Sequence, residues 1–286
     1  MIRRSDILSW SHQAPWGEQW QVEQDLVISR AIIELFSDPL LADTLRFRGG
    51  TALNKLFFIE ALRYSEDIDL VRTTKGPIRP LIDRIRARLT PWLGEPRFVQ
   101  SKIASKLVFL FTSADDLHLK LKVEINTREH QAFAEPVAVP FSVETDWFKG
   151  SCDIPTFCRE EMLATKLRAL LQRNKGRDLI DISHALKTMP DLNDLLIVDV
   201  FNCYIHLANQ SITRAQAEER MFQKLAQPML LNDVKPLLRA DEQISMTHEK
   251  ITEAAELVLT RLISRLPGEP WAKTQAMRDL FGMPLD

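Results

Sequence analysis

Hydrophobic residues change their spacing along the chain, and this spacing predicts most of its elements. Over residues 18–36 apolar positions recur at steps of three and four among charged ones, which is typical of an amphipathic helix. The same spacing predicts a second helix over residues 78–93, begun by prolines and ended before Gly94. Over residues 119–126 leucine, valine and isoleucine alternate with lysine, glutamate and asparagine, so the period of two predicts a half-buried strand.

Other short apolar segments predict four more strands, at residues 45–48, 68–71, 97–103 and 106–112. The first runs into Gly49-Gly50 and a predicted helix over residues 51–58. Beyond residue 159 the pattern is only helical, and it predicts helices over residues 159–172, 178–187, 194–208, 213–226 and 245–266. We therefore expect an α/β (α+β) fold in two domains, a mixed sheet flanked by helices in residues 1–155 and an all-helical domain in residues 156–286.

The composition of the 286-residue chain is that of an ordinary globular protein, with 45% hydrophobic and 27% charged residues. Its 37 lysine and arginine residues against 39 aspartate and glutamate residues give a formal net charge of −2, so a nucleic-acid partner must be held by a local basic patch. The 3 scattered cysteines provide neither a disulfide framework nor a zinc site. No apolar stretch approaches the ~18 residues of a membrane span, and no signal-peptide pattern is present. We expect a soluble, cytoplasmic protein with no membrane partner.

The strongest candidate chemistry lies in residues 46–71, RFRGGTALNKLFFIEALRYSEDIDLV. Gly49 and Gly50 at a strand-to-helix turn let main-chain amides approach a phosphate, and Thr51 can add a hydroxyl; a plain tight turn is the alternative. Asp67 and Asp69 lie on the same side of a strand, where two like charges are unfavourable unless a cation lies between them. Taken alone, this pair is equally compatible with an exposed loop or strand edge.

Together, the glycine turn and the Asp-x-Asp strand resemble the first motif of the DNA polymerase β-like nucleotidyltransferase superfamily. The segments FRGGTAL and RYSEDIDLV resemble one branch of it, the AbiEii/AbiGii toxin family of type IV toxin–antitoxin and abortive-infection systems. The superfamily needs a third carboxylate on a neighbouring strand. Glu124 matches because the alternation places it on the face opposite Val123 and Ile125, although a solvated strand face is the alternative. Many relatives have Gly-Ser where this chain has Gly50-Thr51, so the hydroxyl that contacts phosphate stays open.

A second block, REEMLATKLRALLQRNKGRDLIDI in residues 159–182, resembles two further motifs of the AbiEii family. Lys166 lies at three-residue spacing with Leu163 and Ala169, in an apolar stripe that is unfavourable for it without an anionic partner. A lysine that extends to solvent from the edge of the core is the alternative. Asp178 and Asp181 share a face of the next helix, and could instead only cap its N-terminus. The resemblance leaves residues 183–286 without a recognised motif.

The resemblance implies a polymerase β-like nucleotidyltransferase core with a mixed sheet and a C-terminal all-helical domain that completes the active-site cleft. It implies transfer of a nucleoside monophosphate (NMP) from an NTP, with Mg²⁺ (or Mn²⁺) as cofactor, to an RNA acceptor, the 3′ end of tRNA, which blocks translation and growth. It also implies a toxin of abortive infection and antiviral defence with a cognate antitoxin encoded alongside. The implied roles are metal binding by Asp67, Asp69 and Glu124, catalysis by these three with Lys166, Asp178 and Asp181, and nucleotide binding by Gly49, Gly50, Thr51, Ser65 and Lys166.

Candidate RNA-binding residues lie in a basic stretch, residues 79–106, which holds seven cations against two acids. They are Arg79, Arg84, Arg86 and Arg88, for which a solvated helix face is the alternative. Two other functions stay open: NMP transfer to a protein hydroxyl, such as AMPylation, and a non-catalytic nucleotide-binding regulator. Three converging acids count against the regulator, since nucleotide binding alone does not require them. Scattered histidines and the lack of a serine nucleophile elbow give hydrolases little support.

Overall fold

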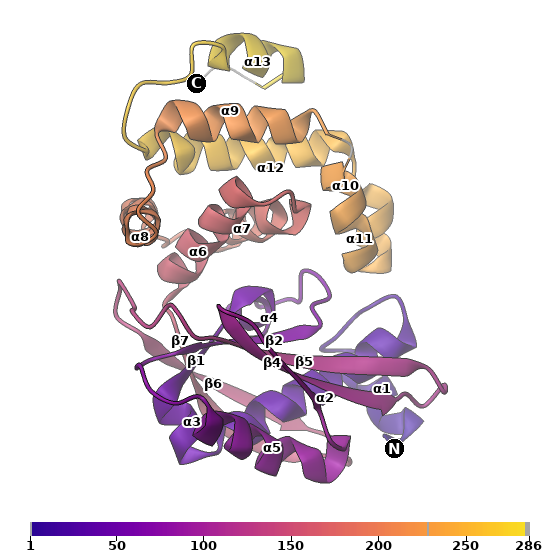
Figure 1. The fold of residues 1–286 in the computed structure, drawn as a ribbon. Helices are drawn as coiled ribbons and strands as arrows, with labels where there is room; N and C mark the ends of the chain where they lie inside the picture. Colours follow the sequence, from indigo (N-terminus) through magenta and orange to yellow (C-terminus); the bar gives the residue numbers. More distant parts are fainter. Residues whose placement is uncertain (1, 228, 284–286) are drawn as a thin grey trace. The chain divides into compact units, whose positions relative to one another are not determined.

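A computed structural model describes residues 2–227 and 229–283 of the chain. The chain forms two compact units, Met1–Cys158 and Arg159–Asp286. The first unit is built on one seven-stranded sheet with the strand order β3-β4-β5-β2-β1-β7-β6 (Figure 1). Its strands are β1 (Leu45–Arg48), β2 (Asp67–Arg72), β3 (Arg97–Gln100), β4 (Ala104–Thr112), β5 (His118–Asn126), β6 (Val137–Glu144) and β7 (Lys149–Thr156).

The middle of the sheet is mixed, as the sequence predicts. Strand β2 pairs antiparallel with β1 and parallel with β5, and β4 and β5 form an antiparallel hairpin. The alternation over β5 sets the two faces of the sheet. On one face Ile68, Val123 and Leu107 lie side by side on β2, β5 and β4, and each is fully buried.

Helices cover this apolar face. The helices of the first unit are α1 (Arg4–Trp10), α2 (Gln19–Phe36), α3 (Pro39–Thr44), α4 (Gly49–Leu56) and α5 (Arg79–Leu93). Figure 1 shows α2, α3 and α5 on one side of the sheet and α4 on the other. The opposite face, which carries the polar residues of β2 and β5, is therefore covered less completely and can present side chains to a substrate.

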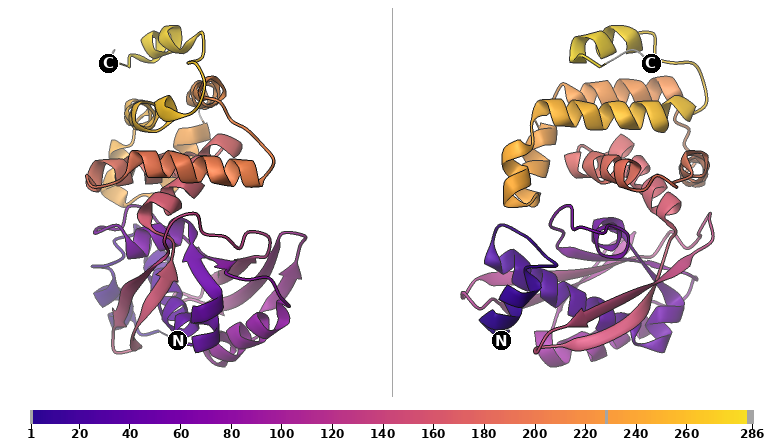
Figure 2. Two further views of the ribbon diagram at one scale, coloured as in Figure 1. Left: turned by 90° about the vertical axis from the view of Figure 1, so that its left-hand side faces the viewer. Right: turned by 180° about the vertical axis from the view of Figure 1, so that it is seen from behind.

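The second unit is helical over its described residues, as the sequence predicts (Figure 2). Its helices are α6 (Arg159–Gln172), α7 (Gly176–Thr188), α8 (Asp194–Leu207), α9 (Arg214–Leu225), α10 (Met229–Val234), α11 (Ala240–Ser245), α12 (His248–Arg261) and α13 (Thr274–Phe281), with short 3₁₀ helices at Lys235–Leu237 and Ile263–Arg265. No helix in the described ranges is both long and apolar enough to cross a membrane.

The hydrophobic pattern did not indicate the hairpin of β6 and β7. Strand β6 is an edge strand that contains Pro140, and most of its residues are exposed or half-buried. Such a strand needs few apolar positions and tolerates proline, which cannot donate to a ladder. The short helices α1, α3, α10, α11 and α13 were also not predicted, because a helix of two turns carries too few periodic positions.

Candidate active site

The glycine turn that follows β1 brings the main chain against the carboxylate of Asp69. Gly49 has φ of +86°, in the left-handed region that residues with a Cβ avoid. A Cβ at this position would lie 2.5 Å from Oδ2 of Asp69. Both the backbone conformation and the close approach therefore require glycine here.

The hydroxyl of Thr51 is used inside the fold. Thr51 is buried, and its Oγ1 donates to the main-chain carbonyl of Asp67 and lies 2.8 Å from Oγ of Ser65. The side chain of Asn54 extends this connection, because its amide donates to the carbonyl of Gly50 at 2.9 Å and its oxygen accepts from the amide of Leu62 at 3.1 Å. Thr51 and Asn54 thus fasten the start of α4 to the segment that leads into β2. Asn54 has no motif spacing that would have indicated this role.

The three predicted carboxylates lie in two neighbouring rungs of the sheet. In the parallel pairing of β2 with β5, Asp67 is opposite Lys122 and Asp69 is opposite Glu124. On the other side of β2, Arg48 of β1 is opposite Asp69. Because directly paired residues share a face, Asp67, Asp69 and Glu124 point to the same side of the sheet.

Two lysines neutralise part of this negative charge. Nζ of Lys122 is 2.8 Å from Oδ2 of Asp67 and 3.5 Å from Oε2 of Glu124. Nζ of Lys106 on β4 is 3.0 Å from the same Glu124 oxygen. Neither lysine was predicted to belong to the site, although the alternation over residues 119–126 already places Lys122 on the face of Glu124.

The pKa values of the site reflect this crowding of charge. Burial raises the pKa of Asp69, and the negative charge of Asp67 raises it further, while Arg48 opposes both. Burial alone would lower the pKa of Lys122, but its hydrogen bond to Asp67 and the surrounding carboxylates raise it overall. The face therefore favours additional positive charge.

The donor chemistry of the carboxylates fits a hard divalent cation, because all three side chains provide oxygen ligands and they repel one another. Within the described ranges, no three His, Cys, Asp or Glu side chains converge as a ready-made set of ligands. The ammonium of Lys122 instead contacts both Asp67 and Glu124. A cation held by these carboxylates would take over the charge-neutralising role of this lysine.

The second group of predicted residues comes together within the helical unit. Lys166 on α6 is buried, and its Nζ lies 3.3 Å from Oδ1 of Asp178 and 2.7 Å from Oδ2 of Asp181, both on α7. Arg173 also donates to Asp178, from Nε at 2.8 Å. Burial alone would raise the pKa of Asp178, but Lys166 and Arg173 hold it below its usual value. The anionic partner that Lys166 needs is thus supplied by its own unit.

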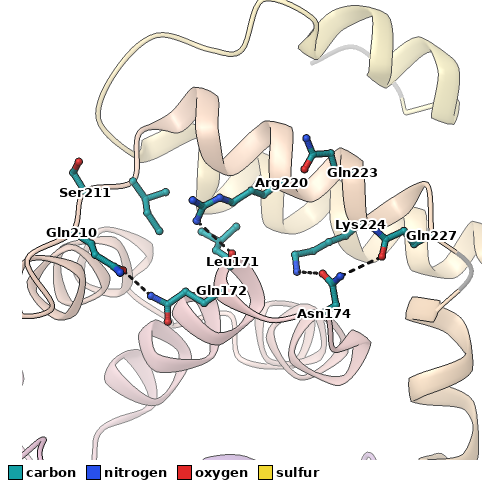
Figure 3. A pocket seen from close by; sticks show the side chains of 10 residues that line it. Leu171, Gln172, Asn174, Gln210, Ser211, Arg220, Gln223, Lys224 and Gln227 are labelled. Carbon is teal, nitrogen blue, oxygen red and sulfur yellow. Dashed lines mark hydrogen bonds between the residues drawn. The ribbon is translucent and has the colours of Figure 1, made fainter.

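A polar cavity of about 860 Å³ borders the turn between α6 and α7 (Figure 3). From α9, Lys224 donates to the carbonyl of Arg173 at 2.6 Å and to Oδ1 of Asn174 at 2.9 Å, and Arg220 lies 3.5 Å from the carbonyl of Leu171. Burial lowers the pKa of Lys224. Because the last carbonyls of a helix carry partial negative charge, these two cations cap α6 and hold the turn that carries Arg173.

The four candidate RNA-binding arginines lie on α5 and point in two directions. Arg84 and Arg88 contact the buried carboxylate of Asp38 at 2.6 and 3.1 Å. Burial alone would raise the pKa of Asp38, but the hydrogen bonds from Arg84 and from the main chain keep it below its usual value. The other two arginines, Arg79 and Arg86, line a small cavity with Phe98 and Gln100 of β3.

Strand register places these arginines relative to the acids. Phe98 is paired with Leu107, and Leu107 is paired with Val123, so the cavity lies on the apolar face of the sheet. The arginines of α5 are therefore on the opposite side from Asp67, Asp69 and Glu124. Binding of RNA by these arginines stays a prediction, and it would occur away from the carboxylates.

Comparison with known proteins agrees with this geometry. A family model described as "Nucleotidyl transferase AbiEii toxin, Type IV TA system" matches residues 30–281. The chain belongs to this family. It is accordingly a nucleotidyltransferase of the toxin type, which confirms the resemblance drawn from the sequence motifs. The match extends well beyond residue 182, where the recognisable motifs end.

Solved structures share the fold at low sequence identity. MenT4, a nucleotidyltransferase toxin from Mycobacterium tuberculosis H37Rv, is 18% identical with a TM-score of 0.61, over 97% of this chain and 93% of that one. A protein from H. pylori named as a nucleotidyltransferase is 17% identical with a TM-score of 0.53, over 88% and 100% of the two chains. JHP933 from Helicobacter pylori is 16% identical with a TM-score of 0.51, over 92% and 98%. No curated protein matches the chain in sequence.

Proposed function

We propose that this AbiEii-family chain transfers an NMP from an NTP to the 3′ end of tRNA, and that the modified tRNA no longer supports translation and growth. One observation carries the proposal: Asp67, Asp69 and Glu124 share one face in adjacent rungs, directly beside the Gly49 turn. Nucleotide binding alone does not require three carboxylates on one face, whereas phosphoryl-group transfer between oxygens does use such a set.

In this proposal Asp67, Asp69 and Glu124 hold Mg²⁺ or Mn²⁺. Such an ion supplies positive charge to the phosphate oxygens and lowers the repulsion between the incoming and leaving groups. Burial and then the negative charge of Asp67 raise the pKa of Asp69, and this supports the assignment, because a bound cation would stabilise the buried charge and relieve the repulsion.

The proposed transfer needs only the NTP and the acceptor hydroxyl as reactants. An oxygen of the acceptor hydroxyl forms a bond to the α-phosphorus of the NTP, the bond from that phosphorus to the bridging oxygen breaks, and pyrophosphate leaves. Glu124, on the strand next to the acid pair, would accept the hydroxyl proton. The main-chain amides at Gly49, Gly50 and Thr51 would bind the phosphates, and Ser65, through its contact with Thr51, would position this turn.

The predicted cluster of Lys166, Asp178 and Asp181 lies within the helical unit. Lys166 is only 6% exposed and contacts both aspartates, which favours a positioning role over direct contact with NTP phosphates. Its ammonium pairs with both buried carboxylates and so positions α7 against α6 within the helical unit. Membership of a type IV toxin–antitoxin family implies an antitoxin partner. We propose that it is encoded alongside, that the pair acts in the cytoplasm, where tRNA is present, and that it serves abortive infection against viruses.

Labelling with radioactive nucleotides tests the proposal. The purified full chain is incubated with each of the four α-labelled NTPs, Mg²⁺, and either total tRNA or cell protein, and the products are separated on a gel. We expect label on tRNA that depends on Mg²⁺ and is lost in Asp69→Asn. Label on a polypeptide band with none on RNA would instead establish a protein hydroxyl as the acceptor and refute the tRNA proposal.

A further inference from the structure

The polar face of the sheet continues past the carboxylates across β4 and β3. Strand β4 is paired with both β5 and β3, so side chains that face the same way can be followed from rung to rung. In several residue pairs that β4 forms with β3 and β5 on this face, a cation lies beside an aliphatic residue. These neighbours are Lys106 with Val99, Arg97 with Val108, and Lys120 with Leu110.

Two of these cations, Arg97 and Lys120, have side chains that are available to a ligand. Arg97 and Lys120 are exposed, and neither forms an ion pair with any residue in the described ranges. Leu110, directly opposite Lys120, is 69% exposed on this face. An exposed leucine between unpaired cations indicates a surface that binds a ligand with both anionic and apolar parts.

A cavity of about 620 Å³ lies beside Lys120 and Leu110. Trp20 lines it from α2, and Gln24 fixes β5 there by donating to the carbonyl of Lys120 at 2.7 Å. Glu66, the residue before Asp67, is the acid that lines the same cavity. The cavity therefore adjoins the segment that carries the catalytic acids of our proposal, and it provides an aromatic and aliphatic wall.

We propose that this face of β3, β4 and β5, together with the adjoining cavity that Trp20 lines from α2, binds the single-stranded end of the RNA acceptor. Arg97 and Lys120 would contact its phosphates, and Leu110 on the face and Trp20 in the cavity would contact a base. The inference rests on the proposed function, because it assigns the acceptor-binding part of that site.

The chemistry of the face favours single-stranded RNA over a protein partner. Phosphates and bases alternate along a nucleic-acid strand, as cations and apolar side chains do here, and stacking on aromatic residues holds single strands in many proteins. The acceptor must also reach the carboxylates, and this face leads to them without interruption. An acidic segment of the antitoxin would be attracted by the same cations, but it has no need to approach the acids.

Binding of a short fluorescein-labelled single-stranded RNA, measured by anisotropy without NTP, tests the inference. The double variant Arg97→Gln/Lys120→Gln is compared with Lys75→Gln/Lys149→Gln, which removes the same charge from exposed positions outside this face. Because the first variant no longer neutralises two RNA phosphates, its slope of log affinity against log salt should become shallower by about 1.4, while the second variant keeps the wild-type slope. At about 0.1 M salt this corresponds to roughly 25-fold weaker binding, and the difference should vanish near 1 M.

Leu110→Asn separates the apolar part of the surface from the charged part. Because Leu110 is largely exposed, the substitution leaves the fold intact, and thermal unfolding verifies this. We expect about fivefold weaker RNA binding with an unchanged salt slope, since every cation that faces a phosphate is still present.

Labelling of the same RNA by the wild-type chain distinguishes failure of the acceptor surface from failure of the proposed function. Label on RNA, together with equal salt slopes for the two double variants, would overturn the acceptor surface and leave the proposed function standing. Label on protein alone would overturn both. Loss of inhibition by the antitoxin in Arg97→Gln/Lys120→Gln, with RNA binding unchanged, would reassign the surface to the antitoxin and overturn the inference.

Discussion

Gly49 is the position at which the smallest substitution tests the geometry of the site. With φ at +86°, its backbone lies in a region that alanine enters at a cost of roughly 1–2 kcal/mol. A Cβ would also lie 2.5 Å from Oδ2 of Asp69 and 3.1 Å from its Cβ. Overpacking of this kind costs about 1–3 kcal/mol, so Gly49→Ala should lower the free energy of unfolding by about 2–5 kcal/mol in all.

The clash can be relieved only if Asp69 or the turn moves, and either movement separates the turn from the carboxylates. If the displaced groups contribute about 4 kcal/mol to the transition state, NMP transfer falls by roughly a thousandfold. Gly94→Ala is the matched control. Gly94 also has a left-handed φ, +80°, but nothing lies within 4 Å of a Cβ built there. Its substitution should destabilise through the backbone alone and leave transfer intact.

Urea unfolding and initial rates of NMP transfer, measured on the same preparations, separate the two effects. The folded fraction at assay temperature is determined first, so that a rate is expressed per folded molecule. If Gly49→Ala transferred NMP as fast as Gly94→Ala, the close approach of the turn to Asp69 would have no part in the reaction, and the site as we describe it would be wrong.

Three further predictions concern charged groups. Asp69→Asn should abolish transfer without lowering the thermal midpoint, because the raised pKa shows that its charge is unfavourable in the fold; a large drop in midpoint would contradict this. Lys166→Met should lower the free energy of unfolding in urea by about 3–5 kcal/mol, because it removes the ammonium that contacts both buried carboxylates, whereas wild-type stability would mean that water already reaches them. The depressed pKa of Asp178 stabilises the folded state at pH values above the unfolded-state pKa of ~3.9, and this stabilisation is lost as the pH falls toward the folded-state pKa. Asp178→Asn should therefore make the free energy of unfolding depend less on pH from about pH 4 downward. An unchanged pH dependence in this acidic range would refute the prediction.

The parts of the fold that follow from a strict period could be predicted from the sequence. The alternation over residues 119–126 leaves only one way to orient β5, so Glu124 and Lys122 had to share a face once the leucines and valine were buried. The helix predicted over residues 18–36 is observed at Gln19–Phe36, because its apolar stripe is long and its ends carry polar residues. The turn at Gly49 and Gly50 could be predicted as well, because glycine is favoured where the main chain between a strand and a helix adopts a positive φ or approaches another group closely.

Strand order and tertiary partners could not be predicted in this way. Lys106 contacts Glu124 only because β4 pairs with β5 in one register, and nothing in the spacing of β4 indicates that partner. The basic stretch that includes α5 was read as one patch, yet its helix packs on the apolar face while Arg97 of the following strand is on the polar one. A linear count of charge does not distinguish the two sides of a sheet.

The lysines paired with the predicted acids differ in how easily a ligand can replace them. Lys122 and Asp67 are 28% and 31% exposed at their side chains, so water screens their attraction and compensates for its loss. The side chain of Lys166 is 8% exposed and that of its partner Asp181 is fully buried, so removal of that ammonium would take a neutralising charge from a buried carboxylate in a medium of low polarity. A cation that arrives with a substrate can therefore displace Lys122 at small cost, but it cannot displace Lys166. In the proposed reaction a metal ion would therefore replace a lysine only at the carboxylates of the sheet, while Lys166 keeps its ion pairs with Asp178 and Asp181.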